Sequence, residues 1–291
     1  MDTSLETTIK NTRMHQIVSW SLIIGLFLLR IPLLGFGDWL ARAPWENVVC
    51  QIGTYLLTAI FLLWECKNLK DFHVDALALW LIVLFKPVIT LILNFWGITD
   101  PFNPFNFPNI PSLLIWIIAI GLAIALWTQR KNLPKFEWKS LGWFGIGILI
   151  GIGSAILLAI PTAFQVDRVS PATFWSFINM GLLTAFCYQI GYAAILEEPF
   201  FRGFLWGMLR KAGWKEVWIW LFQAALFMLG HIFYLGRANG FLSFFIVIPA
   251  CGLILGLIAW KSRRISASMA AHATINDLTV LIGGLAAYYI K

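Results

Sequence analysis

Long apolar runs separated by short polar segments dominate the chain from residue 17 to its end. Each run is about as long as the roughly 20 residues that an α-helix needs to cross a bilayer. The runs cover residues 17–36, 48–64, 76–96, 110–127, 141–164, 172–196 with a continuation to about 209, 214–234, 241–260 and 265–290. They do not alternate apolar and polar residues as the strands of an outer-membrane barrel do. The pattern therefore predicts a bundle of eight to nine transmembrane helices.

Composition narrows the class of protein further. Of the 291 residues, 60% are apolar and 12% are charged, and the mean hydropathy is +0.80, whereas a soluble domain carries about 25% charged residues. This excludes a soluble enzyme and predicts an all-α, polytopic integral membrane protein that has membrane lipids as partners. The net charge of +7 comes largely from lysines and arginines between the apolar runs, which is typical of membrane topology and not of nucleic-acid binding.

The distribution of lysine and arginine predicts the orientation. If the N-terminus is cytoplasmic, every inner segment carries more of these residues than the outer segments beside it, as the positive-inside rule requires. Nine spans then place the C-terminus outside. The proline-rich segment 100–108 should form an external loop. Arg30 and Lys86 lie inside apolar runs, and we assign them no function.

Polar residues that can do chemistry gather in the last four runs. Glu197, Glu198 and Arg202 follow the apolar residues Ala-Ala-Ile-Leu, and His231 stands in the next run. In the last run, His272 is followed by an asparagine four residues later. Because a charge at the bilayer centre costs roughly 2.5–3.5 kcal/mol, each of these residues needs a partner or a function.

Helical spacing sorts these residues. Glu198 and Arg202 are four residues apart, so they share a helix face and can pair. Glu197 points about 100° away from Glu198, and one arginine cannot satisfy both carboxylates equally. His272 and Asn276 also share a face. Pro199 should loosen the helix beside the carboxylates because it lacks an N–H group.

Structural roles account for some of these residues taken singly. Glu198 with Arg202 is best interpreted as a structural ion pair, and His231 alone would be an interhelical hydrogen-bonding group. His272 with Asn276 could likewise join two helices. Together, on three successive predicted helices, these residues favour a functional site.

The motifs resemble those of one family. Glu197-Glu198-Pro-Phe-Phe-Arg202 resembles the EExxxR motif of the CAAX protease and bacteriocin-processing family, also called CPBP or Abi. Phe227-Met-Leu-Gly-His231 resembles its FxxxH motif, and His272-Ala-Thr-Ile-Asn276 resembles its HxxxN motif. The resemblance extends from about residue 173 to the C-terminus. It implies a catalytic membrane domain at residues 172–291. Hydropathy alone predicts the region of about five spans at residues 1–165 that precedes it.

The resemblance also implies an activity, that of an intramembrane endopeptidase similar to type II CAAX prenyl proteases. Carried over residue by residue, Glu197 would activate water with help from His231, and His272 and Asn276 would hold the oxyanion. Glu198 and Arg202 would have supporting roles. The implied substrate is a membrane-anchored or lipidated peptide or protein, either prenylated and CAAX-like or bearing a leader.

The role of a metal stays open at this point. We expect no cofactor, because an asparagine amide is a good hydrogen-bond donor and a poor zinc ligand. If the protein depends on a metal, Glu197, His231 and His272 would bind zinc with one open position.

The two histidines differ in their expected depth in the membrane. At 1.5 Å per residue, His272 would lie about 10 Å from the inner end of its helix and His231 about 25 Å from the inner end of its own.

Two other functions compete with a protease. A transporter or proton-coupled carrier would use intramembrane Glu, His and Arg residues as a relay, but it predicts matching inverted repeats, which are absent from the sequence. A catalytically inactive family member could act as a scaffold or an immunity protein.

Overall fold

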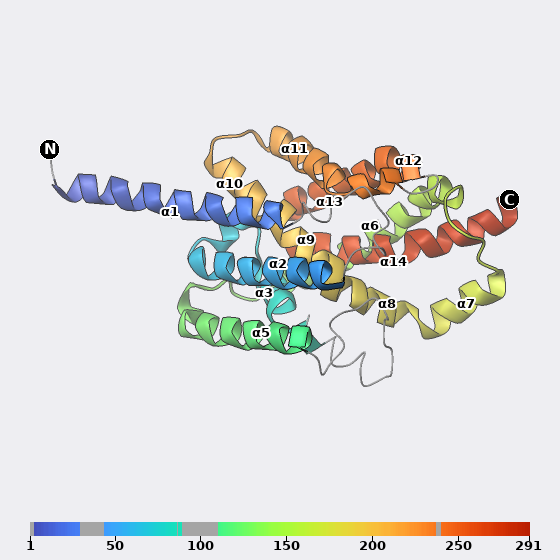
Figure 1. Ribbon diagram of the computed structural model, residues 1–291, viewed down its shortest axis with the longest axis horizontal. Helices are drawn as coiled ribbons and strands as arrows, with labels where there is room; N and C mark the ends of the chain where they lie inside the picture. The colour runs from blue at the N-terminus through green and yellow to red at the C-terminus, as the bar shows by residue number, and fades with distance from the viewer. Residues whose placement is uncertain (1–2, 30–43, 86, 89–109, 237–239) are drawn as a thin grey trace.

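The computed structural model describes residues 3–29, 44–85, 87–88, 110–236 and 240–291, and every regular element in these ranges is a helix (Figure 1). In chain order the elements are α1 (Thr3–Leu28), α2 (Pro44–Trp64), η3 (Leu69–Phe72), α3 (Ala76–Trp80), η4 (Leu81–Phe85), α5 (Ile110–Thr128), η5 (Arg130–Asn132), α6 (Trp138–Ala163), α7 (Pro171–Met180), α8 (Leu182–Gln189), η6 (Ile190–Ala194), α9 (Ile195–Glu198), η7 (Pro199–Leu205), α10 (Trp206–Lys211), α11 (Glu216–Leu229), η8 (Ile232–Gly236), α12 (Gly240–Leu242), η9 (Ser243–Val247), α13 (Ile248–Ser262) and α14 (Ile265–Ile290). Of the η elements, η4, η6, η7 and η9 are π-helical and the others are 3₁₀-helical. The predicted all-α fold class is confirmed for the described ranges.

Five helical stretches in the described part of the chain are long and apolar enough to cross a membrane. They are Ile110–Thr128, Trp138–Ala163, Glu216–Gly236, Gly240–Ser262 and Ile265–Ile290. The number becomes six if Pro171–Asn179 and Leu182–Lys211, which meet at a bend of 70°, form one broken span. The chain is an integral membrane protein, but the predicted eight to nine spans are not confirmed.

The first three apolar runs account for this difference. The ends of the first and third runs, residues 30–36 and 89–96, lie outside the described residues, as do Arg30, Lys86 and the predicted loop at 100–108. The described apolar parts of α1 and α2 are only 10–17 residues long. At 1.5 Å per residue, apolar stretches of that length fall short of a hydrocarbon core of about 30 Å.

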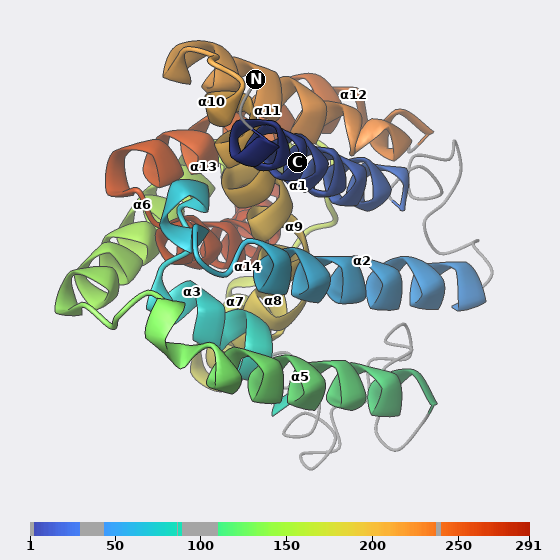
Figure 2. The same ribbon diagram turned by 90° about the vertical axis from the view of Figure 1, so that its left-hand side faces the viewer.

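Helix α14 forms the centre of the bundle. Nearly every residue from Ile265 to Thr279 is buried, because α6, α13 and the segment from α8 to η6 cover it on different sides. Two glycines of α6 permit the closest approach. A Cβ atom on Gly147 would lie 2.2 Å from the carbonyl oxygen of Ala267, and one on Gly151 would lie 2.6 Å from Cβ of Thr274. Figure 2 shows α1, α2 and α5 on one side of this core, where α2 packs against both α1 and α5.

Hydrogen bonds of His73 hold the connection between α2 and α3 in place. Nε2 of the buried His73 accepts hydrogen bonds from Nη1 of Arg210 and of Arg263, each at 3.2 Å. The backbone N–H of Ile265, the first residue of α14, donates to the carbonyl oxygen of His73 at 2.9 Å. Burial, with the two arginines adding to it, lowers the pKa of His73 to about 3. His73 is therefore neutral at pH 7 and links this connection to the start of α14.

Candidate active site

Glu197 and Glu198 lie in a helical segment interrupted by two π-helical turns. The turn η6 ends just before α9, which contains both carboxylates, and η7 begins at Pro199. This agrees with the expected loosening of the helix at a residue that lacks an N–H group. The two side chains point in different directions, as their spacing predicts. Glu197 lines a cavity and is 16% exposed, whereas Glu198 is completely buried.

Glu198 and Arg202 form the predicted ion pair, with both side chains completely buried. Nη1 of Arg202 donates to Oε1 of Glu198 at 2.9 Å, and Nη2 donates to the carbonyl oxygen of Gly252 at 3.4 Å. The guanidinium carbon also lies 4.4 Å from the centre of the Phe227 ring. The pair therefore connects the glutamate-bearing segment to α11 and α13.

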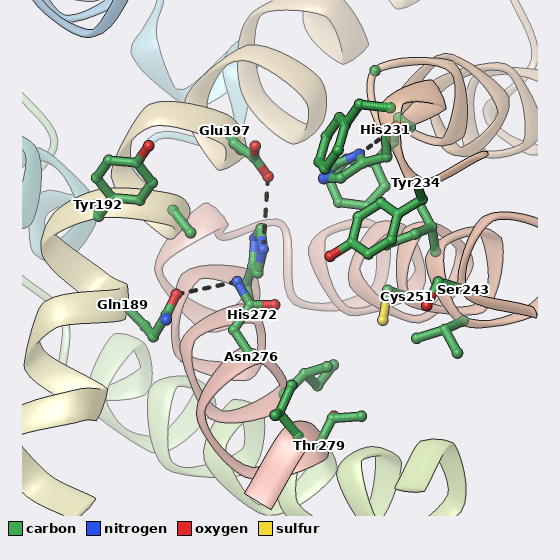
Figure 3. Close-up of a pocket in the computed structure, with 18 of the residues that line it drawn as sticks. Gln189, Tyr192, Glu197, His231, Tyr234, Ser243, Cys251, His272, Asn276 and Thr279 are labelled. Atoms are coloured by element: carbon green, nitrogen blue, oxygen red, sulfur yellow. Dashed lines mark hydrogen bonds and ion pairs between the residues drawn. The ribbon is translucent and has the colours of Figure 1, made fainter. Parts of the chain in front are cut away.

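His272 lies between the two carboxylates, which the spacing along the chain did not predict. Its Nδ1 donates to Oε1 of Glu198 at 2.8 Å. Its Nε2 lies 3.7 Å from Oε2 of Glu197, as Figure 3 shows. Because a carboxylate oxygen only accepts hydrogen bonds, the bond to Glu198 requires a proton on Nδ1. Glu198 thereby fixes the orientation of the imidazole ring.

His231 lies just beyond the end of α11, and its own helix orients it. Its Nδ1 donates to the carbonyl oxygen of Phe227 at 2.8 Å, and the two rings are 4.5 Å apart between centroids. This contact confirms the expected pairing of Phe227 and His231 across one helical turn. The bond to a carbonyl places the proton of the neutral ring on Nδ1, so Nε2 is the acceptor nitrogen.

A single cavity of about 660 Å³ is lined by all four proposed catalytic residues, Glu197, His231, His272 and Asn276. Nδ2 of Asn276 donates to Oε1 of Gln189 at 3.2 Å, on the same side of the cavity as His272 (Figure 3). Glu198 and Arg202 do not line the cavity, and Glu198 contacts it only through His272. The structure therefore brings together the residues of all three motifs.

The expected mismatch in depth does not separate the two histidines. Phe227, one helical turn before His231, has its ring centroid 6.0 Å from that of His272. α11 therefore passes α14 at the level of Phe227, and His231 lies one turn farther along and still reaches the same cavity.

Comparison with known proteins agrees with the motifs. Residues 179–278 match the family model described as Rce1-like, type II CAAX prenyl endopeptidase Rce1-like. This segment belongs to the CAAX protease family. The match includes the helices that carry all three motifs and ends two residues after Asn276. No curated protein and no solved structure matches the chain.

The family that this segment matches is a family of proteases, which are hydrolases. The carrier and the inactive scaffold considered as alternatives receive no support from the fold or from the family match. The family match covers only residues 179–278, so the proposed boundary near residues 165–172 stays a prediction.

The side chains that could bind a metal ion are not grouped together in the described part of the chain. Among the described residues, no group of three or more His, Cys, Asp or Glu side chains lies close enough together to hold a metal ion. Glu197, His231 and His272, the residues named for a possible zinc site, do not form such a group.

The cavity of the CAAX protease segment also contains polar residues that the motifs did not indicate. Gln189 contacts Asn276, and Nε2 of Gln51 in α2 donates to the hydroxyl oxygen of Tyr192 at 3.2 Å. Tyr234 lines the opposite side, next to His231 (Figure 3). An isolated carboxamide in an apolar run, such as that of Gln189, is a signal that could have drawn attention to this position.

Proposed function

We propose that the chain is an intramembrane endopeptidase in which Glu197 activates water to hydrolyse a peptide bond of a membrane-associated substrate. The observation that carries this proposal is the convergence of Glu197, His231, His272 and Asn276 on one cavity, although they come from three separate helical segments. A purely structural role would not require these four side chains to share a cavity.

The proposed reaction begins with a water molecule beside Glu197. The carboxylate accepts one proton from the water while the water oxygen attacks the carbonyl carbon of the substrate. Nε2 of His231, the acceptor nitrogen of that ring, orients the same water. When the C–N bond breaks, Glu197 returns its proton to the leaving amine, and the new carboxylic acid releases the second proton of the water to solvent.

His272 and Asn276 would stabilise the negative charge that forms on the carbonyl oxygen. Asn276 donates through an amide N–H group. His272 already donates from Nδ1 to Glu198, so it can donate from Nε2 only as an imidazolium. The buried carboxylate of Glu198 orients the ring through this bond, as the aspartate of a Ser-His-Asp triad does. Fixed donors of this kind typically contribute a factor of about 10²–10³ each in rate.

The proposed substrate is a membrane-anchored or lipidated peptide, either prenylated and CAAX-like or bearing a leader. Apolar residues such as Phe227, Val247 and Ile248 line the cavity together with the polar groups of the site. Such a mixed surface suits a peptide whose cleaved bond is polar and whose attached chain is apolar.

The experiment that tests the proposal measures cleavage of a fluorogenic lipidated peptide by the purified chain in detergent. Glu197→Gln keeps the size of the side chain but cannot accept the proton, so kcat should fall by about 10²–10⁴ with little change in KM. His231→Ala should cost a similar factor, and the double variant should be little worse than either single one because the two act as a unit. Glu137→Gln is the matched control, because it makes the same change on an exposed side chain that does not line the cavity. Wild-type activity in Glu197→Gln would overturn the mechanism.

A further inference from the structure

Two hydrogen bonds join the glutamate-bearing segment to α14. Oε1 of Glu198 accepts from His272 at 2.8 Å, and Oε1 of Gln189 accepts from Asn276 at 3.2 Å. The two partners on α14 occur in the opposite order along the chain to those on the other segment, so the two segments run antiparallel. Each residue proposed to hold the oxyanion therefore donates to a side-chain oxygen from the same neighbouring segment.

The π-helical turn η6 is what brings Gln189 to the face of the segment that carries Glu197. In an uninterrupted α-helix, these two residues would point about 80° apart, since they are eight positions apart. A π-helical turn has i→i+5 hydrogen bonds and acts as one extra residue, which removes about 100° and leaves the two side chains within about 20°. Both side chains line the cavity, as this geometry requires.

The bond to Gln189 decides which atoms Asn276 presents to a substrate. The terminal torsion of an asparagine side chain has a broad, roughly two-fold preference. Without a partner, the carboxamide can turn its oxygen toward the cavity, where it would repel an oxyanion. The oxygen of Gln189 accepts one N–H of Asn276, which fixes the plane of the amide and leaves the second N–H as a donor.

We infer that Gln189 is a positioning residue, which holds the Asn276 carboxamide in the orientation that donates to the carbonyl oxygen of the scissile bond. The inference rests on the proposed function, because it needs Asn276 to be an oxyanion donor. Gln189 does for Asn276 what Glu198 does for His272. It acts through Asn276 and not on the substrate.

The test measures kcat and KM for purified full-length variants on the fluorogenic lipidated peptide, per amount of monodisperse protein. Asn276→Ala should lower kcat by about 10²–10³. Gln189→Leu removes the acceptor and should lower kcat by about 10–100-fold, the range expected when a catalytic group is present but misplaced, with little change in KM. Gln189→Glu keeps an acceptor oxygen and should retain more activity than Gln189→Leu.

The double variant distinguishes positioning from other roles. Gln189→Leu combined with Asn276→Ala should be no less active than Asn276→Ala alone, because Gln189 has nothing left to position. Gln129→Leu is the matched control. This glutamine also accepts a hydrogen bond from a side chain, that of Cys66, but it does not line the cavity. Gln189→Met, which has an unbranched side chain of similar length, replaces Gln189→Leu if that variant does not fold.

The outcomes separate the two proposals. Wild-type kcat in Gln189→Leu and Gln189→Met, or losses that add in the double variant, would overturn the positioning role while Glu197→Gln still reports on hydrolysis. A raised KM at unchanged kcat would also overturn it and would assign Gln189 to substrate binding. Wild-type activity in Asn276→Ala would overturn both the oxyanion role of Asn276 and this inference.

Discussion

Replacing Arg202 by methionine should destabilise the protein because it leaves the Glu198 carboxylate buried without its cationic partner. Both side chains of the pair are completely buried, and Nη1 and Oε1 are 2.9 Å apart. Removing one partner of such a pair costs about 3–5 kcal/mol of unfolding free energy. At about 2–4 °C per kcal/mol, the melting temperature should fall by about 6–20 °C.

The double variant Glu198→Gln/Arg202→Met separates stability from activity. It removes both charges, so most of the lost stability should return, since a buried pair can be replaced by neutral groups at little cost. Activity should stay low, because the amide introduced in place of the Glu198 carboxylate holds the His272 ring only by a neutral hydrogen bond, which is weaker than the bond to a carboxylate. The expected combination is a nearly normal melting temperature with strongly reduced kcat.

The assay is thermal unfolding in detergent, with cleavage of the fluorogenic peptide measured on the same samples. Arg263→Met is the matched control. Arg263 pairs with Glu216 at 2.8 Å, but the two side chains are 48% and 23% exposed, and such pairs are worth only about 0–1 kcal/mol. Its hydrogen bond to His73 adds about 0.5–1.5 kcal/mol, so the control should lose less stability than Arg202→Met. A melting temperature unchanged by Arg202→Met, together with lost activity, would refute the structural role. A double variant as unstable as Arg202→Met would refute the explanation by a stranded charge.

Three further predictions concern metal, pH and orientation. A strong zinc chelator should leave the peptide cleavage unchanged, and loss of activity that added Zn²⁺ restores would establish a metal mechanism. Because His73 is neutral in the folded protein, with its pKa lowered from 6.5 to about 3, its contribution to stability is complete above pH 6.5 and is lost as the pH falls toward 3. Each pH unit in this range lowers the free energy of unfolding by about 1.4 kcal/mol. The melting temperature of His73→Gln should therefore depend less on pH between 6.5 and 4.5 than that of the wild type. The same dependence in both proteins would show that His73 is not its source. Reporters inserted at Lys131 and Asp167, at opposite ends of α6, should be found on opposite sides of the membrane with Lys131 inside, and a common side would rule out the predicted orientation.

The sequence by itself determined the class of protein and most of the candidate site. Apolar runs near bilayer length predicted the helices α5, α6 and α14 and the stretch Gly240–Ser262 closely, because hydrophobic length is a local property of the chain. Spacing of four residues predicted the Glu198–Arg202 pair and the contact of Phe227 with His231, because residues on one helical turn meet whatever surrounds them.

The tertiary structure decided the contacts between helices. Glu198 and His272 are 74 residues apart, and Gln189 and Asn276 are 87 residues apart, so no local pattern contains either bond. Regular helical periodicity would also separate Gln189 from the face of Glu197, because it assumes 3.6 residues per turn and the π-helical turn η6 does not have that period. The sequence thus identified which side chains must be accommodated inside the membrane, and helix packing determined which of them orient one another.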